Sequence, residues 1–420
     1  MTSSSTGRIP GDPATVRRST AARRVSRIIG LTLAAIAAAV MYVTLFRTSA
    51  SPARTPASPS RPSANRRAAS HTAIALHQRA EFAAGSGTLD PIQFDPIRFD
   101  PRGTIVVAMT GSSQISAWST SNGQQLTGFA AMPGGTSASS SSLSSPAFSP
   151  DGKEFSVINA GYGGGVADVW NMATGQATPV PLPLVSSSYT ANYAVPGPDG
   201  LIADSYGNGT LGLVATATGQ PEVMLPLNRG AGIGYQISEP VFSPDGQTVA
   251  VSDDLGMLHL LNVPAKRLIA ALRVEKIYNV ASPNGMSSLD VDSIVFSPDS
   301  TRVACGTESG IVRVWDVASG QNVSTFSVNG SAPGDTDARP VKTLVFSPDG
   351  KLLVTADNAD STLAVWDVAS GREVATVNAG GGKVASAAFT TNGTLIVATV
   401  GDSASGATIG LWVTGSKLGS

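Results

Sequence analysis

The sequence is poor in the residues that most often build catalytic and metal sites. Among 420 residues there are one cysteine, Cys305, and three histidines, His71, His77 and His259. A single cysteine excludes an internal disulfide, and so few histidines predict neither a zinc cluster nor a Ser-His-Asp group. The glycine runs at 163–165 and 380–382 lack the flanking strand and helix of a nucleotide-binding motif. We therefore predict no metal, no cofactor and no enzymatic activity, with Cys305 as a small buried residue.

Charge is scarce and unevenly distributed. Asp, Glu, Lys and Arg make up 14% of the residues, and the formal net charge is −1. Residues 1–70 nevertheless hold eleven arginines and one acid, Asp12, whereas residues 71–420 hold 17 basic and 28 acidic residues. An acidic body repels phosphate backbones, so nucleic acid is not an expected partner, and the basic segment suits an anionic membrane surface.

One apolar run predicts a transmembrane helix. Residues 28–46 carry no charge, and at about 1.5 Å per residue they would span roughly 28 Å, close to the hydrocarbon thickness of a bilayer. A signal peptide cleaved near residues 48–50 is the nearest alternative, although the run exceeds a usual signal core. We predict a single-pass anchor in the cell membrane, with the basic tail 1–27 cytoplasmic and the body extracytoplasmic. Residues 47–70, rich in Pro, Ser, Ala and Arg, are expected to be a disordered tether.

The remaining chain repeats a turn motif. An aromatic residue at a strand end is followed by Pro, by Asp or Asn, and by Gly, which together favour a β-turn. The clear copies start at Phe99, Phe148, Phe242, Phe296 and Phe346, and two weaker copies start at Val195 and Phe389. Seven copies in 71–417 correspond to units of roughly 50 residues.

A second apolar strand follows about twenty residues after each aromatic and ends in a tryptophan and a turn containing Gly. All five tryptophans of the protein occupy this one position: Trp118, Trp170, Trp315, Trp366 and Trp412. In the other two units Val214 and Leu261 stand in the place of the tryptophan. Short strands joined by regular turns predict an all-β repeat fold.

These units resemble WD repeats (WD40 repeats), and two of them contain a literal Trp-Asp pair, at Trp315 and Trp366. The resemblance covers residues 71–417 and is to the membrane-anchored bacterial type of the family. It implies a seven-bladed β-propeller of four-stranded blades, strand a innermost and strand d outermost, that acts as a scaffold for protein binding. The Gly-His pair common in the family is missing, and only Asp360 stands where many members have an Asp six residues before the tryptophan. The blades are therefore expected to be held by strand pairing and apolar packing alone.

Strand order can be predicted at two places. Three prolines in 177–184 predict an outer strand, because a central strand cannot tolerate them. The last unit has a third strand at 409–412 and no fourth strand after it. The apolar stretch 72–77 is the expected donor of that strand, because an unpaired edge is a liability; a short helix at 72–77 is the alternative.

A partner site is expected on the face of the disc formed by the b–c and d–a loops. Tyrosine is enriched at interfaces because it offers rigid contact area with one polar end. By this strand assignment six tyrosines fall in or beside these loops in units two to five: Tyr162, Tyr189, Tyr193, Tyr206, Tyr235 and Tyr278. We predict a protein- or glycan-binding patch there, rimmed by Asp253, Asp254, Glu308 and Arg339; the alternative is that each tyrosine caps its own loop.

The sequence does not exclude a cation site built from oxygen ligands alone. Three carboxylate pairs near loop tips could bind a hard cation weakly, although solvated turn residues are the plainer interpretation: Asp253/Asp254, Asp290/Asp292 and Asp335/Asp337. The competing function is a propeller enzyme, lactonase-like or quinoprotein-like, with a metal or cofactor over the central channel. A purely structural surface spacer is the third possibility.

Overall fold

A computed structural model gives the fold of the following parts of the chain. The described residues are 72–83, 97–110, 114–126, 146–159, 165–183, 191–227, 236–274, 291–328, 340–356, 362–379, 383–403 and 406–414. The chain divides into two units, Met1–Arg67 and Ala68–Ser420, and every described residue belongs to the second. The predicted basic tail, transmembrane helix and tether therefore lie outside the described residues. Within the described ranges, no helix has the length and apolar character needed to cross a bilayer.

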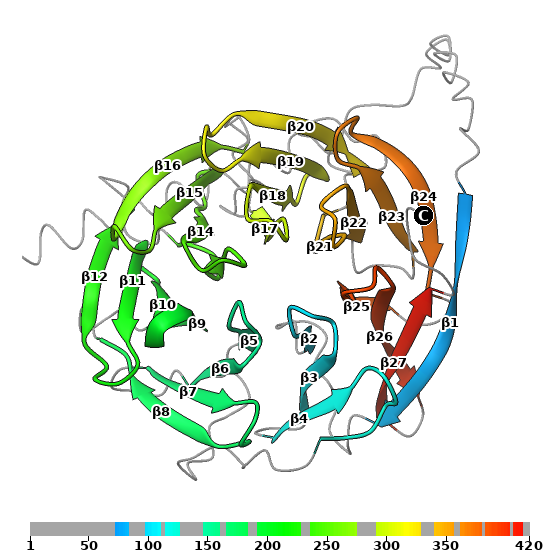
Figure 1. The fold of residues 1–420 in the computed structure, drawn as a ribbon, viewed down its shortest axis with the longest axis horizontal. Helices are drawn as coiled ribbons and strands as arrows, with labels where there is room; N and C mark the ends of the chain where they lie inside the picture. The colour runs from blue at the N-terminus through cyan, green and yellow to red at the C-terminus, as the bar shows by residue number, and fades with distance from the viewer. Residues whose placement is uncertain are drawn as a thin grey trace, which may run out of the picture. The chain divides into compact units, whose positions relative to one another are not determined.

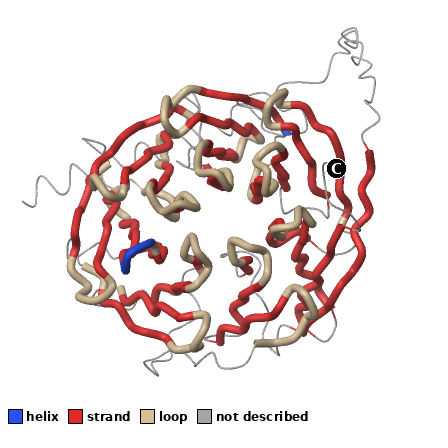
Figure 2. The backbone as a smooth tube through the Cα atoms, in the orientation of Figure 1, coloured by secondary structure: helices blue, strands red, loops and turns tan. Residues whose placement is uncertain are grey.

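The second unit is an all-β propeller with seven blades around a central axis, as predicted (Figure 1). Each blade is an antiparallel sheet whose strands follow the chain from the axis outward, except that β1 is the outer strand of blade 7. A short 3₁₀ turn, η2 (Pro198–Gly200), connects the first two strands of blade 3 (Figure 2). Blade 1 consists of β2 (Ile97–Phe99), β3 (Ile105–Thr110) and β4 (Gln114–Ser119). Blade 2 consists of β5 (Ala147–Phe148), β6 (Glu154–Asn159), β7 (Val166–Asn171) and β8 (Ala177–Pro181). Blade 3 consists of β9 (Ala191–Pro196), β10 (Leu201–Tyr206), β11 (Thr210–Ala215) and β12 (Pro221–Pro226). Blades 4 and 5 consist of β13 (Val241–Phe242), β14 (Thr248–Ser252), β15 (Met257–Asn262) and β16 (Arg267–Arg273); and β17 (Val291–Phe296), β18 (Arg302–Thr307), β19 (Ile311–Asp316) and β20 (Asn322–Ser327). Blades 6 and 7 consist of β21 (Thr343–Phe346), β22 (Leu352–Ala356), β23 (Thr362–Asp367) and β24 (Arg372–Asn378); and β25 (Lys383–Phe389), β26 (Leu395–Ser403), β27 (Gly406–Thr414) and β1 (Thr72–Ala83).

Strand β1 closes the ring, in a different register from the one predicted. Its residues 76–83 pair antiparallel with 408–414 of β27, with an irregularity between Gln78 and Ala80. Residues 72–75 instead pair in parallel with 375–378 of β24, the outer strand of blade 6. The predicted fourth strand of blade 7 is therefore confirmed, whereas its placement at 72–77 alone was wrong. The reason is that β1 is longer than the apolar stretch and joins two blades into one eight-stranded sheet.

The core lies between the blades. Buried apolar side chains of the described residues form seven clusters, one for each interface between neighbouring blades. The cluster between blades 7 and 1, for example, joins Leu411 and Ile396 to Ile97 and Val106. Since burial of apolar area stabilises each interface, every blade depends on both of its neighbours.

The tryptophan position of the repeat serves one structural purpose throughout. Trp118, Trp170, Trp315, Trp366 and Trp412 each pack into the interface with the preceding blade. Leu261, which replaces tryptophan in blade 4, does the same against blade 3. In blade 6 the indole of Trp366 stacks on Phe326 of blade 5 with ring centroids 4.6 Å apart. These residues define the blades by filling the space between them.

Apolar packing is not the only attachment inside the blades, which corrects the expectation from the missing Gly-His pair. Trp366 Nε1 donates a hydrogen bond to Thr355 Oγ1 on the adjacent strand at 3.0 Å. Trp412 Nε1 makes the equivalent bond to Thr399 Oγ1 at 2.9 Å. In blades 6 and 7 a threonine hydroxyl thus accepts a hydrogen bond from the tryptophan indole, which the sequence analysis did not predict.

Candidate functional site

The structure tests the placement of some of the predicted binding residues. Tyr193, Tyr206, Asp253, Asp254 and Glu308 are described, and they lie in three consecutive blades. Tyr162, Tyr189, Tyr235, Tyr278 and Arg339 lie outside the described residues, as do Asp290, Asp335 and Asp337. We call the side of the disc that carries the b–c turns, such as 253–256 and 308–310, the loop face, and the opposite side the turn face.

Tyr206 is a core residue and does not belong to an exposed patch. It ends β10 with no exposed area and packs among Ile202 and Val169 between blades 2 and 3. Its hydroxyl donates a hydrogen bond to Asp204 Oδ2, two residues earlier on the same face of the strand. The ring therefore cannot reach a partner. Tyr206 lies beside the b–c turn as expected, but it does not contribute to the predicted binding patch.

Asp204 is a buried carboxyl with a raised pKa. Burial raises its pKa to about 7, although the hydrogen bond from Tyr206 acts in the opposite direction. Its Oδ1 has no hydrogen-bond partner among the described residues. Gly212 faces it on the neighbouring strand, and a Cβ at that glycine would overlap the carboxyl. The space for this side chain is therefore provided by the glycine, and the pair is part of the blade interior.

Asp253 holds together the b–c turn of blade 4. Its Oδ1 accepts hydrogen bonds from the backbone N–H groups of Leu255 and Met257, each at 2.9 Å. Its Oδ2 lies 2.7 Å from His259 Nε2 across the hairpin, and both side chains are buried. Asp253 therefore stabilises its own turn and is not a rim residue. Asp254, the next residue, is half-buried, and burial raises its pKa.

An ion pair crosses the central channel near the loop face. Arg98 lies on β2 of blade 1, and Glu239 lies in the segment 236–240 that enters blade 4. Arg98 Nη2 is 3.2 Å from Glu239 Oε2, and about a quarter of each side chain is exposed, 29% and 25%. Blades 1 and 4 are not neighbours, so the two side chains meet across the channel that the innermost strands line (Figure 1).

Tyr193 belongs to this channel group. It lies on β9, the innermost strand of blade 3, and is half-buried. Burial raises the pKa of its phenol, the Glu239 carboxylate raises it further, and the Arg98 guanidinium lowers it. Both charges of the ion pair therefore act on the phenol of Tyr193. The structure thus brings together one predicted residue, Tyr193, with two that the sequence analysis missed. The available signal was a charged residue of each sign in or beside an innermost strand, but Asp292 on β17 and Lys383 on β25 give the same signal, so it does not single out this pair.

On the turn face, the polar side chains of the a–b turns hydrogen-bond to one another. In five blades the first hydroxyl of the a–b turn donates to the Oδ1 of the Asp or Asn two residues later, namely in Ser149–Asp151, Ser243–Asp245, Ser297–Asp299, Ser347–Asp349 and Thr390–Asn392. In the Ser347 turn the hydroxyl also accepts the N–H of Leu352 at 2.9 Å. The Ser347 hydroxyl, by bonding the anion, holds the pKa of Asp349 below its usual range. These side chains satisfy one another and build the turns.

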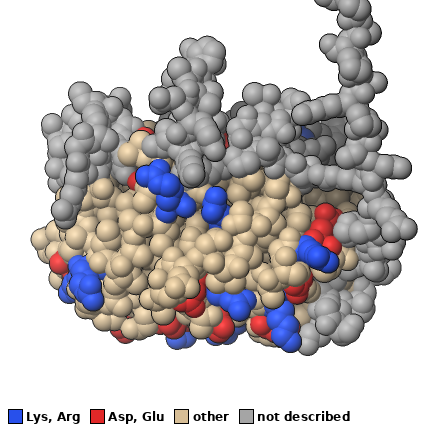
Figure 3. Space-filling model, turned by 90° about the horizontal axis from the view of Figure 1, so that it is seen from above, with Lys and Arg blue, Asp and Glu red and all other residues tan. Residues whose placement is uncertain are grey.

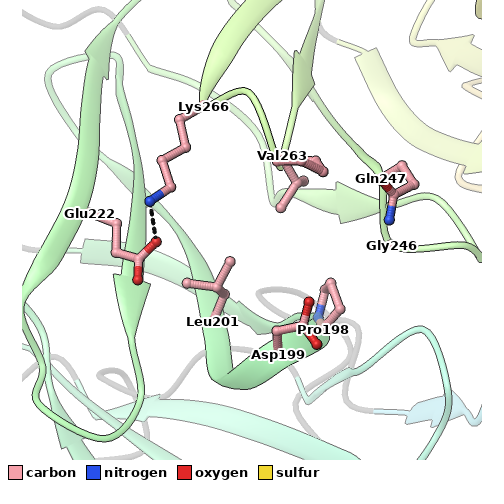
Figure 4. A pocket seen from close by; sticks show the side chains of 9 residues that line it. Pro198, Asp199, Leu201, Glu222, Gly246, Gln247, Val263 and Lys266 are labelled. Atoms are coloured by element: carbon pink, nitrogen blue, oxygen red, sulfur yellow. Dashed lines mark ion pairs between the residues drawn. The ribbon is translucent and has the colours of Figure 1, made fainter.

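A shallow hollow on the turn face lies between blades 3 and 4 (Figure 4). Pro198, Leu201 and Val263 line it, and Lys266 Nζ forms an ion pair with Glu222 Oε2 at 2.7 Å at its edge. Asp199 and Gln247 also line the hollow, so it presents a carboxylate and an amide beside its apolar residues. Over the described surface seen in Figure 3, basic and acidic side chains are interspersed. Among the described residues, no group of three or more His, Cys, Asp or Glu side chains is arranged to hold a metal ion.

Comparisons with known proteins agree with the fold. The β-propeller family described as "Nucleolar protein 10-like, N-terminal domain" matches residues 226–408. The WD repeat-containing protein SL1-17 of Schistosoma mansoni is 29% identical over 133 residues, which cover 32% of this chain and 37% of that protein. A guanine nucleotide-binding protein subunit beta of Arabidopsis thaliana is 31% identical over 85 residues, which cover 20% and 22%. The human apoptotic protease-activating factor 1 is 32% identical over 137 residues, which cover 33% and 10%.

Each match spans well under half of the relative's own length. The family match runs from the last residue of β12 in blade 3 to β27 in blade 7. The chain is thus a seven-bladed β-propeller that is similar to WD-repeat proteins over parts of its length.

Proposed function

We propose that this propeller is a non-catalytic scaffold that binds a protein or glycan partner on its loop face. The observation that carries the proposal is the channel group of Tyr193, Arg98 and Glu239. It combines a half-buried tyrosine with charges of both signs at one place, whereas the a–b turn side chains on the opposite face bond one another. Tyr and Arg are the residue types that most often dominate binding energy at interfaces.

The relatives support a binding role in general terms. One of them is named as a subunit, the beta subunit of a guanine nucleotide-binding protein. A propeller presents loops from several blades on one rigid disc, which suits recognition more than chemistry. The identity of the partner is expected to depend on the loops of this particular chain.

The same proposal includes a membrane tether of the kind found in membrane-anchored bacterial members of the family. Residues 28–46 have the length and composition of a single transmembrane helix, and 47–70 would hold the propeller away from the bilayer. The dense arginines before the helix favour a cytoplasmic N-terminus and an extracytoplasmic propeller. A reporter fused after Ser420 tests this orientation, because activity only in the cytoplasm would contradict it.

Site-specific photo-crosslinking in intact cells tests the binding face. A photoreactive phenylalanine analogue replaces Tyr193 or Glu308 on the loop-face side and, as the control, exposed Asp349 on the turn face. We expect protein or glycan adducts at positions 193 and 308 and none at 349. Adducts at 349 alone would contradict the assignment of the face, and no adducts at any position would contradict the scaffold function itself.

A further inference from the structure

The outer strand of blade 4, β16, like β20 of blade 5, lacks the edge protection that the outer strands of blades 2, 3 and 6 have. Exposed backbone edges invite pairing with another chain, and proteins commonly protect them with proline or by covering them. The outer strands of blades 2 and 3, β8 and β12, each contain two prolines. The edge of β24 in blade 6 is covered by β1. Strand β16 has seven residues and no proline, and within the described sheets it pairs only with β15.

Strand β16 is also apolar on the outside. Leu268 and Ile269 are each 39% exposed, and they are two of the five large apolar side chains that the described surface exposes. Two others, Val323 and Val374, lie near the start of the outer strands of the next two blades. The apolar residues thus follow the outer wall of blades 4 to 6, where β16, β20 and β24 succeed one another around the rim (Figure 1).

The backbone of β16 has outward-facing groups. The N–H of Val274 donates to the carbonyl of Gly256 at 2.9 Å, so Val274 faces β15. Because hydrogen-bonded and non-hydrogen-bonded positions alternate in an antiparallel pair, Ala271 and Arg273 direct their N–H and C=O groups away from β15. An added strand could pair with these groups without disturbing the blade.

The same molecule already adds a strand in this way. Residues 72–75 of β1 pair in parallel with 375–378, on the outer edge of β24. Blade 6 therefore accepts a segment from the far end of the chain at the edge that corresponds to the free edge of β16.

The charges at the two ends of β16 indicate which kind of chain can pair with its free edge. Arg267 and Arg273 are exposed at the two ends of β16, and neither forms an ion pair among the described residues. Antiparallel pairing of β16 with a second copy centred at Ala270 would set these arginines opposite each other, which disfavours a dimer. The chain's own tether, 47–70, contains five arginines and no acid, so it would be repelled as well.

We propose that β16 is a docking edge for an extended segment of another protein, with apolar residues in its middle and an acidic residue near each end. This inference rests on the proposed scaffold function and gives it a second surface, because main-chain pairing provides affinity and the flanking charges provide selectivity. The partner segment adds to blade 4 as β1 adds to blade 6.

A designed peptide tests the edge without knowledge of the natural partner. The probe is the fluorescein-labelled peptide Glu-Val-Thr-Val-Thr-Val-Glu, and its counterpart carries Lys in place of both Glu. We measure binding to the purified full-length chain by fluorescence anisotropy. We expect the acidic probe to bind about tenfold more tightly than the lysine peptide, because two exposed ion pairs are gained instead of two repulsions.

Two pairs of variants separate the edge from other sites. Ala271→Pro removes an outward N–H and should abolish binding, whereas Ala271→Thr retains the N–H and should bind as the native chain does. The double variant Arg267→Glu and Arg273→Glu should reverse the preference in favour of the lysine peptide. Melting temperatures within a few degrees of one another establish that the variants fold.

Equal binding by folded Ala271→Pro and Ala271→Thr would overturn the proposal, and so would the absence of binding by either peptide. A dimer of the native chain that Ala271→Pro disrupts would show that a second copy occupies the edge. Failure of β16 leaves crosslinking at Tyr193 unaffected, so the docking edge and the scaffold function are tested separately.

Discussion

The indole N–H of Trp366 on β23 donates a hydrogen bond to the hydroxyl of Thr355 on β22. Thr355 lies two residues after Leu353, which is the cross-strand partner of Trp366. In blade 2 the corresponding position holds Val157, because Phe155 pairs with Trp170. Trp170 is completely buried, and its Nε1 has no partner among the described residues. The Oδ1 of Asp168, which pairs with Val157, lacks one as well, and burial raises the pKa of this carboxyl to about 6.

The first prediction follows from this difference between the two blades. Val157→Thr should supply an acceptor for Trp170 and a donor for Asp168 at nearly constant volume, and it should raise the free energy of unfolding by about 1 kcal/mol. Thr355→Val should lower it by about 1–2 kcal/mol, because the Trp366 N–H is left without an acceptor. Urea unfolding measures both changes.

The matched control for this exchange is Val354→Thr. Val354 is completely buried in the apolar cluster between blades 6 and 7. A hydroxyl buried there among apolar side chains should cost about 1–3 kcal/mol. If Val157→Thr destabilised the protein as much as Val354→Thr does, the two open positions in blade 2 would not be available to the new hydroxyl.

The second prediction concerns closure of the ring. Deletion of residues 72–83 removes the outer strand of blade 7 and its parallel connection to β24. We expect a loss of more than about 3 kcal/mol of stability, which corresponds to a fall of at least roughly 4 °C in melting temperature. Deletion of residues 1–67, a separate unit that leaves β1 in place, should change the melting temperature of the propeller little. Equal effects of the two deletions would contradict a closing role for β1.

The sequence predicts the fold well because the repeat is dictated by local chemistry. A Pro-Asp-Gly turn needs particular residues at particular backbone angles, and the large indole fills the same interface in five blades. The outer position of β8 was predictable for the same reason, since its prolines cannot donate to a neighbour on both sides.

The parts that the sequence misassigned depend on register and on side-chain direction. Tyr206 lies beside the b–c turn, as predicted, yet it is the last residue of β10 and its ring is buried between two blades. The register of β1 depends on an irregularity at Gln78–Ala80 that no residue pattern announces. The contact between Arg98 and Glu239 joins residues 141 positions apart, and only the closed ring brings them together.

The third prediction separates backbone strain from packing at two equivalent turn glycines. Gly103 and Gly350 both have a left-handed backbone, with φ of 63° and 67°. A Cβ at Gly103 would lie 2.8 Å from the carbonyl oxygen of Phe389 in blade 7, whereas a Cβ at Gly350 would meet only Ser297 Cβ, at 3.9 Å. Gly350→Ala should therefore cost about 1–2 kcal/mol from the backbone alone. Gly103→Ala should cost at least about 1 kcal/mol more, because backbone must move at the contact between blades 1 and 7. Chemical denaturation of the two variants checks the order, and equal costs would show that this contact is looser than the structure indicates.

The fourth prediction is a pH dependence that arises from Asp204. Burial raises its pKa to about 7, from an ordinary value of 3.8. Below about pH 4 the carboxyl is protonated in both the folded and the unfolded chain, so it contributes no pH dependence there. Between about pH 4 and 7 only the unfolded chain ionises, so the free energy of unfolding falls as the pH rises, and above about pH 7 it levels off.

Asp204→Asn should remove this contribution while retaining a group that can accept the hydrogen bond from Tyr206. We compare urea unfolding of the native chain and the variant at pH 4.5 and at pH 8. The native chain should lose about 3 kcal/mol relative to the variant between the two conditions, since each pKa unit corresponds to about 1.4 kcal/mol. Asp168→Asn serves as the comparison, because its carboxyl has a smaller upward shift of pKa and should give a smaller change of the same sign. A difference between native chain and Asp204→Asn that stays constant with pH would mean that Asp204 is ionised in the folded protein, with water or a rearranged Tyr206 stabilising its charge.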